Sequence, residues 1–160
     1  MNTGQRLLKI FNILLKSFGK RNWWPGETPL EIIVGAVLTQ NTSWKNVQKA
    51  IQNMKNECVL DIESLYRIGT ERLSEIIRPS GFYNLKANRL KNIVNVIYNN
   101  YGASIDNMAN ISLDELRHSL LEINGIGPET ADSILLYALN KPIFVVDAYT
   151  KRFLSNHRLH

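Results

Sequence analysis

A glycine-flanked turn is the short segment of this chain whose residue types best suit a chemical role. Residues 120–132 read Leu-Leu-Glu-Ile-Asn-Gly-Ile-Gly-Pro-Glu-Thr-Ala-Asp, and Gly125 and Gly127 interrupt helical spacing there. Unpaired backbone N–H groups at the start of the second helix, together with its dipole, can hold a phosphate group. Glycine allows the phosphate to approach closely. The other interpretation, which Gly-x-Gly alone favours, is an ordinary corner between two helices.

A lone carboxylate further along the chain is the second candidate. Asp147 follows the short apolar stretch Ile143–Val146 and stands directly before an expected helix. As a helix cap, its side chain would accept hydrogen bonds from backbone N–H groups. In a cleft, it could stabilise positive charge on a sugar or activate water. The residues alone leave both interpretations open.

Helices must position these groups, because apolar residues recur at helical spacing and no alternating pattern is long enough for a sheet. The spacing therefore predicts an all-α fold. In the first half, the expected helices are Leu7–Phe18 ended by Gly19, Pro29–Leu38 behind a capping box of Thr28 and Glu31, one begun by Ser43 with Val47, Ala50, Ile51 and Met54 inward, and one from Thr70 to Pro79. In the second half they are one with the stripe Ala87, Leu90, Val94 and Ile97 ended by Gly102, one behind a capping box of Ser112 and Glu115, and one after Pro128 with Ala131, Ile134, Leu135 and Ala138.

Composition narrows the class of protein. The chain has 160 residues, 44% of them apolar, which suits a folded domain rather than a disordered chain. No apolar run approaches the ~20 residues of a membrane span, and the N-terminus does not read as a signal peptide. Cys58 is the single cysteine, so an internal disulfide is excluded. We expect a cytoplasmic protein.

Positive charge is segregated along the chain. The net charge is +5, residues 1–21 carry five bases and no acid, and residues 78–91 carry four bases and no acid. Such segregation suits a polyanion such as DNA. The alternative is a solvated face with no partner.

These motifs together resemble the helix-hairpin-helix DNA glycosylases of base-excision repair, the superfamily of endonuclease III. Residues 37–42, Val-Leu-Thr-Gln-Asn-Thr, resemble the family's loop that pushes a polar side chain into the duplex. Residues 81–87, Gly-Phe-Tyr-Asn-Leu-Lys-Ala, resemble its Gly-x-Tyr-x-x-Lys-Ala helix start. With Trp23-Trp24-Pro25, the chain is most similar to the endonuclease-III-like 3-methyladenine DNA glycosylases, over about residues 5–155.

The resemblance implies two helical lobes with an active cleft between them. Residues 1–22 would be a helix of the second lobe, residues 23–140 a helical barrel ending in the helix-hairpin-helix at 112–139, and residues 141–160 the start of a C-terminal lobe, the rest of which we expect to be missing. The implied activity is flipping of a damaged base from double-stranded DNA and hydrolysis of its N-glycosidic bond, with 3-methyladenine-type bases first. Lyase members carry a lysine nucleophile where Glu129 stands, so a monofunctional enzyme is expected.

The resemblance also assigns roles residue by residue. Asp147 matches the catalytic carboxylate, which stabilises an oxocarbenium-like sugar. The other matches are the DNA-backbone hairpin Gly125, Ile126, Gly127 and Thr130, the duplex wedge Gln40 and Asn41, the stacking pocket Trp23, Trp24 and Pro25, and the phosphate contacts Lys86 and Arg89. Each has a plainer alternative: polar helix caps for the wedge pair, core packing for a tryptophan, and a solvated helix face for the two bases.

The resemblance also implies which cofactors this chain could hold. The carbonyls of Leu121, Ile123 and Ile126 match a monovalent-cation site, and Cys58 alone cannot hold the iron–sulfur cluster of many relatives. The enzyme alternative is an endonuclease III-type glycosylase for oxidised or mismatched bases. The non-enzyme alternative is a catalytically inactive DNA-binding fragment. We expect a monomer that is associated with the nucleoid and does not bind a membrane.

Overall fold

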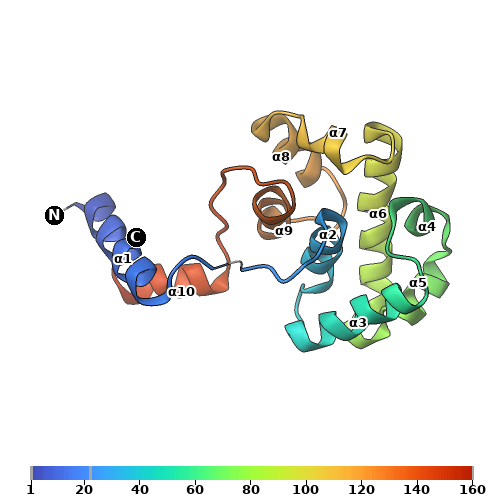
Figure 1. The fold of residues 1–160 in the computed structure, drawn as a ribbon, viewed down its shortest axis with the longest axis horizontal. Helices are drawn as coiled ribbons and strands as arrows, with labels where there is room; N and C mark the ends of the chain where they lie inside the picture. The colour runs from blue at the N-terminus through green and yellow to red at the C-terminus, as the bar shows by residue number, and fades with distance from the viewer. Residues whose placement is uncertain (1, 22, 160) are drawn as a thin grey trace. The chain divides into compact units, whose positions relative to one another are not determined.

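The computed structural model describes residues 2–21 and 23–159, and all its regular elements are helical (Figure 1). The prediction of an all-α fold is thus confirmed. No described helix is long and apolar enough to cross a membrane. The elements are α1 (Thr3–Phe18), α2 (Pro29–Leu38), α3 (Trp44–Asn56), α4 (Ile62–Arg67), α5 (Thr70–Ile76), the 3-10 turn η1 (Arg78–Ser80), α6 (Tyr83–Tyr101), α7 (Ile105–Ala109), α8 (Leu113–Leu121), α9 (Pro128–Ser133), the π-helical turn η2 (Ile134–Ala138) and α10 (Ala148–Asn156).

The chain divides into two compact units. One unit combines the N-terminal Met1–Pro25 with the C-terminal Val145–His160, and the other is Gly26–Phe144. The first unit contains α1 and α10, and the second contains the remaining helices. The hairpin predicted to grip DNA and the loop predicted to enter the duplex therefore lie in one unit.

Two helices form the centre of the Gly26–Phe144 unit. Helix α2 is apolar on all sides, and Ile33, Val34, Val37 and Leu38 are fully buried, as expected of a helix surrounded by others. It contacts α3, α6, α9 and η2. The long α6 contacts α4 and α5 and ends at Gly102, in the left-handed conformation that glycine adopts readily. The loop that follows α2 therefore lies beside the first turns of α6.

The helix ends agree with the sequence in most places, but each of the two predicted capping boxes forms only its first half in the described residues. At α8 that half is the hydroxyl of Ser112, which accepts from the N–H of Glu115 at 3.4 Å. The hydroxyl of Thr28 accepts a hydrogen bond from the N–H of Glu31 at 3.1 Å, as predicted. The return half of that capping box is wrong, because the Glu31 carboxylate lies 3.0 Å from the ammonium of Lys55 instead. Glu31 is buried, so its carboxylate needs a partner, and the ammonium of Lys55 supplies one. A complete capping box forms at the start of α1, where Asn2 and Gln5 exchange hydrogen bonds.

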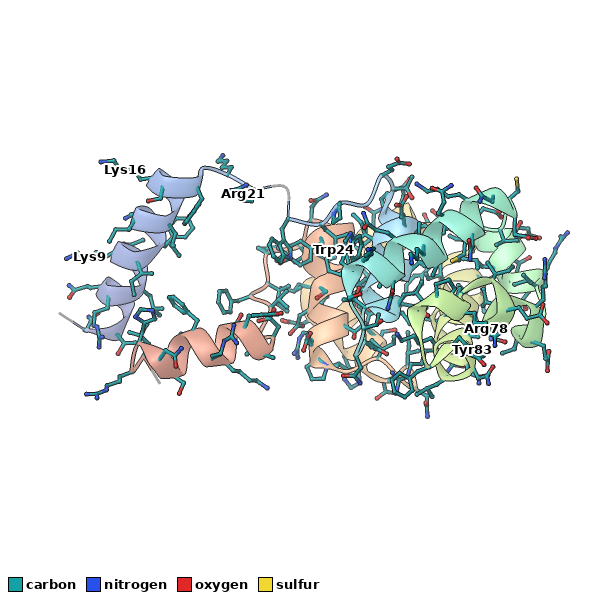
Figure 2. The ribbon with its side chains drawn as sticks, turned by 90° about the horizontal axis from the view of Figure 1, so that it is seen from below. Lys9, Lys16, Arg21, Trp24, Arg78 and Tyr83 are labelled. Carbon is teal, nitrogen blue, oxygen red and sulfur yellow. The ribbon has the colours of Figure 1, made fainter. Side chains whose placement is uncertain are left out.

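The Met1–Pro25 and Val145–His160 unit is built on α1 and α10. The Arg6 guanidinium donates to the carbonyl of His157 at 3.0 Å, joining the start of α1 to the end of α10. Figure 2 shows Lys9 and Lys16 pointing outward from α1. Because they are seven residues apart, they lie on one face of α1, opposite its apolar residues. This unit thus carries a basic stripe on its surface.

Candidate functional site

The predicted hairpin is present between α8 and α9. Gly125 has φ of +92°, which glycine tolerates and other residues rarely adopt. The N–H of Ile126 donates to the carbonyl of Ile123 at 3.0 Å, and both side chains are buried, so the turn is anchored from inside. Gly127 precedes Pro128, which opens α9. At Gly127, which has no side chain, the turn therefore exposes its backbone.

An ion pair that no local sequence pattern indicates joins the two helices of the hairpin. Arg117 of α8 donates to both carboxylate oxygens of Asp132 of α9, at 2.7 and 3.3 Å. Asp132 is buried, and the pair raises the pKa of Arg117. A paired buried carboxylate is stable only with its partner in place, so this contact fixes the angle between α8 and α9.

Helix α6 presses one side chain against the turn. A Cβ atom on Gly125 would lie 2.3 Å from Cγ and 2.8 Å from Cδ of Arg89, so the arginine stem packs directly on the glycine backbone. A side chain at residue 125 would displace Arg89. The positive φ and this contact both require glycine there.

Gln40 is tied to the hairpin rather than extended into solvent. Its Nε2 donates to the carbonyl of Gly125 at 3.1 Å and to the hydroxyl of Thr130 at 2.9 Å. Its Oε1 accepts a hydrogen bond from the Arg89 guanidinium. The neighbouring Asn41 is exposed, with φ of +53°. The structure thus separates the two residues predicted as a wedge.

Lys86 does not lie where the sequence analysis placed it. Its side chain is 1% exposed, and its ammonium donates to the carbonyls of Leu38, at 2.8 Å, and Ser80, at 2.7 Å. Both the predicted phosphate contact and the solvated-face alternative are therefore wrong for Lys86. Its role is internal: it joins the end of α2 to η1.

Burial has a further consequence for Lys86. Loss of hydration, with a smaller contribution from the Arg89 guanidinium, lowers the pKa of Lys86 to about 8. The unfolded chain keeps this proton up to its ordinary value near 10.5. Between pH 8 and 10, the unfolded state therefore binds more protons than the folded state, and a rise in pH favours folding.

We expect this linkage to be measurable in urea unfolding at pH 7, 8, 9 and 10. Relative to Lys86→Met, the unchanged chain should gain up to about 1.4 kcal/mol of unfolding free energy for each pH unit above 8. The comparison cancels the titration of other lysines and tyrosines. Parallel pH profiles for the two proteins would contradict the assignment.

Arg89 is half-buried between α6 and the hairpin. Its Nε is buried and has no hydrogen-bond partner in the described part of the chain. The solvated-face alternative is wrong for Arg89 too, because its stem covers Gly125 and its head contacts Gln40. A phosphate contact by Arg89 stays a prediction.

Asp147 caps α10, as one of its two interpretations predicted. Its Oδ1 accepts a hydrogen bond from the N–H of Thr150 at 2.7 Å, and the side chain is half-buried. The Thr150 hydroxyl in turn donates to the carbonyl of Val145 at 3.4 Å. This geometry fixes the carboxylate at the start of the helix. The catalytic role of Asp147 stays a prediction. Glu129 is an exposed acid in the first turn of α9, and its place at the position of the lysine nucleophile also stays a prediction.

The aromatic pocket residues differ in exposure. Trp23 is 71% exposed, Trp24 is half-buried and Pro25 is exposed. Their pocket role stays a prediction. A second aromatic lies at the start of α6, where the guanidinium of Arg78 stands 5.7 Å from the ring centre of Tyr83 (Figure 2).

Negative charge gathers elsewhere in the Gly26–Phe144 unit. A hollow of about 310 Å³ is lined by Glu27, Glu31, Asp61 and Lys55, among others. Lys55 lies within 3.0 Å of both glutamates and lowers the pKa of Glu27. Carboxylates repel a polyanion, so this hollow is not a candidate for binding DNA.

Metal ligands of the usual side-chain kind do not cluster in residues 2–21 and 23–159, where no three His, Cys, Asp or Glu side chains converge. The predicted monovalent-cation site needs only carbonyls. Ile123 and Ile126 do lie in one turn, and the Ile123 carbonyl keeps a second lone pair beyond its bond to Ile126. Backbone carbonyl oxygens of this turn are therefore the type of ligand that a monovalent cation needs.

Comparison with known proteins adds independent evidence. Residues 34–160 match the family described as the HhH-GPD superfamily base excision DNA repair protein. A Methanocaldococcus jannaschii protein assigned as a DNA repair glycosylase is 54% identical over 156 residues, 96% of this chain and 70% of that relative. Endonuclease III of Thermotoga maritima is 30% identical over 128 residues, 80% of this chain and 55% of its own length.

Among the solved structures that are similar along nearly the whole chain is one of a DNA glycosylase. It is the H. pylori 3-methyladenine DNA glycosylase bound to 1,N6-ethenoadenine, with a TM-score of 0.83 and 34% sequence identity. The similarity covers 98% of this chain and 74% of that one.

Proposed function

The chain belongs to the HhH-GPD superfamily of base excision DNA repair proteins, and from this membership we propose that it is a monofunctional DNA glycosylase for alkylated bases of the 3-methyladenine type. The observation that carries the substrate class is the similarity to the H. pylori 3-methyladenine DNA glycosylase, at 34% identity over 98% of the chain. The chain spans only part of each relative, so the proposal concerns what these residues contribute.

The chemistry proposed is hydrolysis at the sugar. As the N-glycosidic bond breaks, positive charge develops on the deoxyribose, and the Asp147 carboxylate stabilises it. The cap contact to the N–H of Thr150 occupies Oδ1 and holds the group in one orientation. Water then completes the displacement. An alkylated purine is cationic, so an aromatic face such as Trp24 attracts it by ~0.5–2 kcal/mol.

The absence of lyase chemistry is the second part of the proposal. A Schiff base needs an amine near the sugar, and Glu129 carries a carboxylate at the position of the lysine in lyase members of the superfamily. Glu129 lies in the first turn of α9, where the helix dipole stabilises its negative charge.

DNA is the proposed partner, held through its backbone. The uncovered backbone at Gly127 would meet a phosphate, and a monovalent cation on the carbonyls of Leu121, Ile123 and Ile126 would add positive charge. Lys9 and Lys16 on α1 supply further basic surface (Figure 2).

A second candidate function has one observation in its favour. Endonuclease III of Thermotoga maritima is 30% identical over 80% of the chain, which favours an oxidised or mismatched base as the substrate. The two candidates differ in the base released.

The test is chromatography of the free bases released from methylated duplex DNA, in parallel with duplexes carrying an oxidised pyrimidine or a mismatch. We expect 3-methyladenine in the supernatant and intact strands on a denaturing gel. Release from the oxidised duplex alone would replace the first candidate by the second. Strand cleavage with borohydride-trappable protein would contradict the monofunctional assignment.

A further inference from the structure

Three exposed positive charges of the Gly26–Phe144 unit have no acid to balance them, and they come from neighbouring elements. We propose that Lys45, Lys49 and Arg78 form a second contact with the DNA backbone, separate from the phosphate site at the hairpin. We call these three residues the α3–η1 patch. The inference rests on the proposed DNA-binding function and deepens it.

Most cations of this unit already have partners inside the protein. Four pair with acids, and these are Lys55, Arg67, Arg72 and Arg117. Three donate to backbone carbonyls, and these are Lys86, Lys91 and Lys141. Arg89 contacts Gln40. The patch is what is left: within residues 2–21 and 23–159, its three charged groups have no ion pair and no hydrogen bond, and Arg78 stands over the ring of Tyr83.

The fold brings the three residues of the patch together. Lys45 and Lys49 are four residues apart, so they lie on one side of α3. Helix α3 packs against η1, which begins at Arg78. Asn53, one turn after Lys49, donates its side-chain amide to the carbonyl of Ile76 at 3.0 Å, two residues before Arg78. The opposite side of α3 is buried and carries Val47, Ala50, Ile51 and Met54.

No acid lies in the sequence around the patch. Residues 32–56 and 76–105 contain neither Asp nor Glu. Acids return directly after α3, where Glu57 and Glu75 line a hollow of about 300 Å³ and both pair with Arg72. Exposed charge along α3 therefore changes from unpaired lysines at its start to balanced ion pairs beyond its end. A polyanion is attracted to the first part of α3 and not to the second.

The place of the patch in the fold favours DNA over an acidic protein as its partner. Lys86 donates both to the Leu38 carbonyl, at the end of α2, and to the Ser80 carbonyl, at the end of η1. Gln40, in the loop between α2 and α3, donates to the Gly125 carbonyl of the hairpin. One loop thus contacts the element that bears Arg78 at one side and the hairpin at the other, so a duplex held by the hairpin passes close to the patch.

Two separate backbone contacts do what one cannot. A single phosphate on the hairpin leaves the duplex free to turn about that point, whereas a second contact on other elements fixes its register and orientation. Flexible lysines suit this task, because their ammonium groups attract phosphates without demanding one geometry. The patch therefore holds DNA in position and reads no base.

The experiment measures affinity for an undamaged duplex by fluorescence anisotropy at several salt concentrations. It compares the unchanged chain with Lys49→Gln, with Arg78→Gln, and with a triple variant that adds Lys45→Gln to both. Arg67→Gln is the matched control, because it removes the same charge from an arginine of the same unit whose side chain is 75% exposed and already paired with Glu63. Urea unfolding checks that each variant is folded.

We expect each single patch variant to weaken binding about fivefold near 0.15 M salt and to reduce the slope of log affinity against log salt by about 0.9. The triple variant should reduce the slope by about 2.7. Arg67→Gln should leave the slope unchanged. The ratio of affinities for abasic-site and undamaged duplexes should stay constant in the patch variants, because phosphate contacts carry no base information.

Duplexes with one phosphate at a time replaced by a neutral methylphosphonate locate the contact. A replacement at a phosphate bound by Lys49 should weaken binding by the unchanged chain but have no further effect on Lys49→Gln, because that contact is already lost. The same scan with Gly127→Ala identifies the phosphates of the hairpin site. We expect two sets that share no phosphate.

Two results would overturn the proposal. Salt slopes of Lys49→Gln and Arg78→Gln equal to that of Arg67→Gln would mean that the patch is a solvated surface or meets an acidic partner other than DNA. One shared set of phosphates would mean that the patch only extends the hairpin site. Absence of base release by the unchanged chain would refute the proposed glycosylase activity and leave this binding test decisive, whereas absence of duplex binding would refute both.

Discussion

Asp147→Asn should lower the single-turnover rate of base release by about 10²–10³-fold, while the protein folds and binds duplex DNA as the unchanged chain does. The reason is that asparagine keeps the shape and the acceptor oxygen but loses the negative charge. Asp147 Oδ1 caps α10 through the N–H of Thr150 at 2.7 Å, and asparagine caps helices as well as aspartate. The substitution therefore separates the carboxylate's charge from its structural contact.

Two companion variants make that separation complete. Asp147→Ser keeps a capping acceptor without a carboxylate and should match Asp147→Asn in both stability and loss of activity. Asp147→Ala removes the cap as well and should lower the free energy of unfolding by about 1 kcal/mol. Urea unfolding and base release are measured for all three. Base release by Asp147→Asn within threefold of the unchanged rate would mean that Asp147 is a cap and nothing more.

Local patterns in the sequence predicted most of the helices because their causes are local. The stretch Leu7–Phe18 ends at Gly19. Asp147 caps the last helix, and this is predictable because a capping oxygen and the N–H that donates to it lie three residues apart. The short helices α4 and α7 were missed, because six- and five-residue segments show too little periodicity to stand out.

The burial of Lys86 follows from its place in the helical repeat of α6. Lys86, Leu90, Ile93 and Ile97 follow the helical repeat of a buried stripe, and all four are buried in α6. Reading the lysine by its charge alone placed it on the surface. A long side chain can keep its ammonium among carbonyls, provided that they lie within reach, as those of Leu38 and Ser80 do.

The contacts of Gln40 could not have been predicted from the sequence. Its partners Gly125 and Thr130 lie 85 and 90 residues away, and nothing in the local pattern links them. Arg117 and Asp132 are only 15 residues apart, but their pairing depends on the angle at which α8 and α9 cross, which no local pattern shows. Such contacts depend on how α2, α6 and the hairpin pack, so they emerge only once the tertiary structure is known. They are also the contacts that give the candidate site its rigidity.

The two glycines of the hairpin should respond to alanine in different ways. Gly125→Ala should lower the free energy of unfolding by about 1–3 kcal/mol, because φ of +92° is strained for alanine and its Cβ would lie 2.3 Å from Arg89 Cγ. Gly127→Ala should leave stability within about 0.5 kcal/mol, because φ is −91° and no atom lies within 4 Å of an added Cβ.

Gly127→Ala, which should leave stability nearly unchanged, should nevertheless weaken binding to duplex DNA. A Cβ at residue 127 would stand on the exposed backbone that we propose meets a phosphate, so Gly127→Ala should weaken duplex binding at least tenfold in a fully stable protein. Urea unfolding and fluorescence anisotropy on the same two variants test both statements. If Gly127→Ala bound the duplex as tightly as the unchanged chain, the phosphate would not sit on this turn, and the hairpin would be a corner between two helices. If Gly127→Ala lost binding without losing stability, glycine at residue 127 would be required for DNA binding, whereas glycine at residue 125 is required for the packing of Arg89.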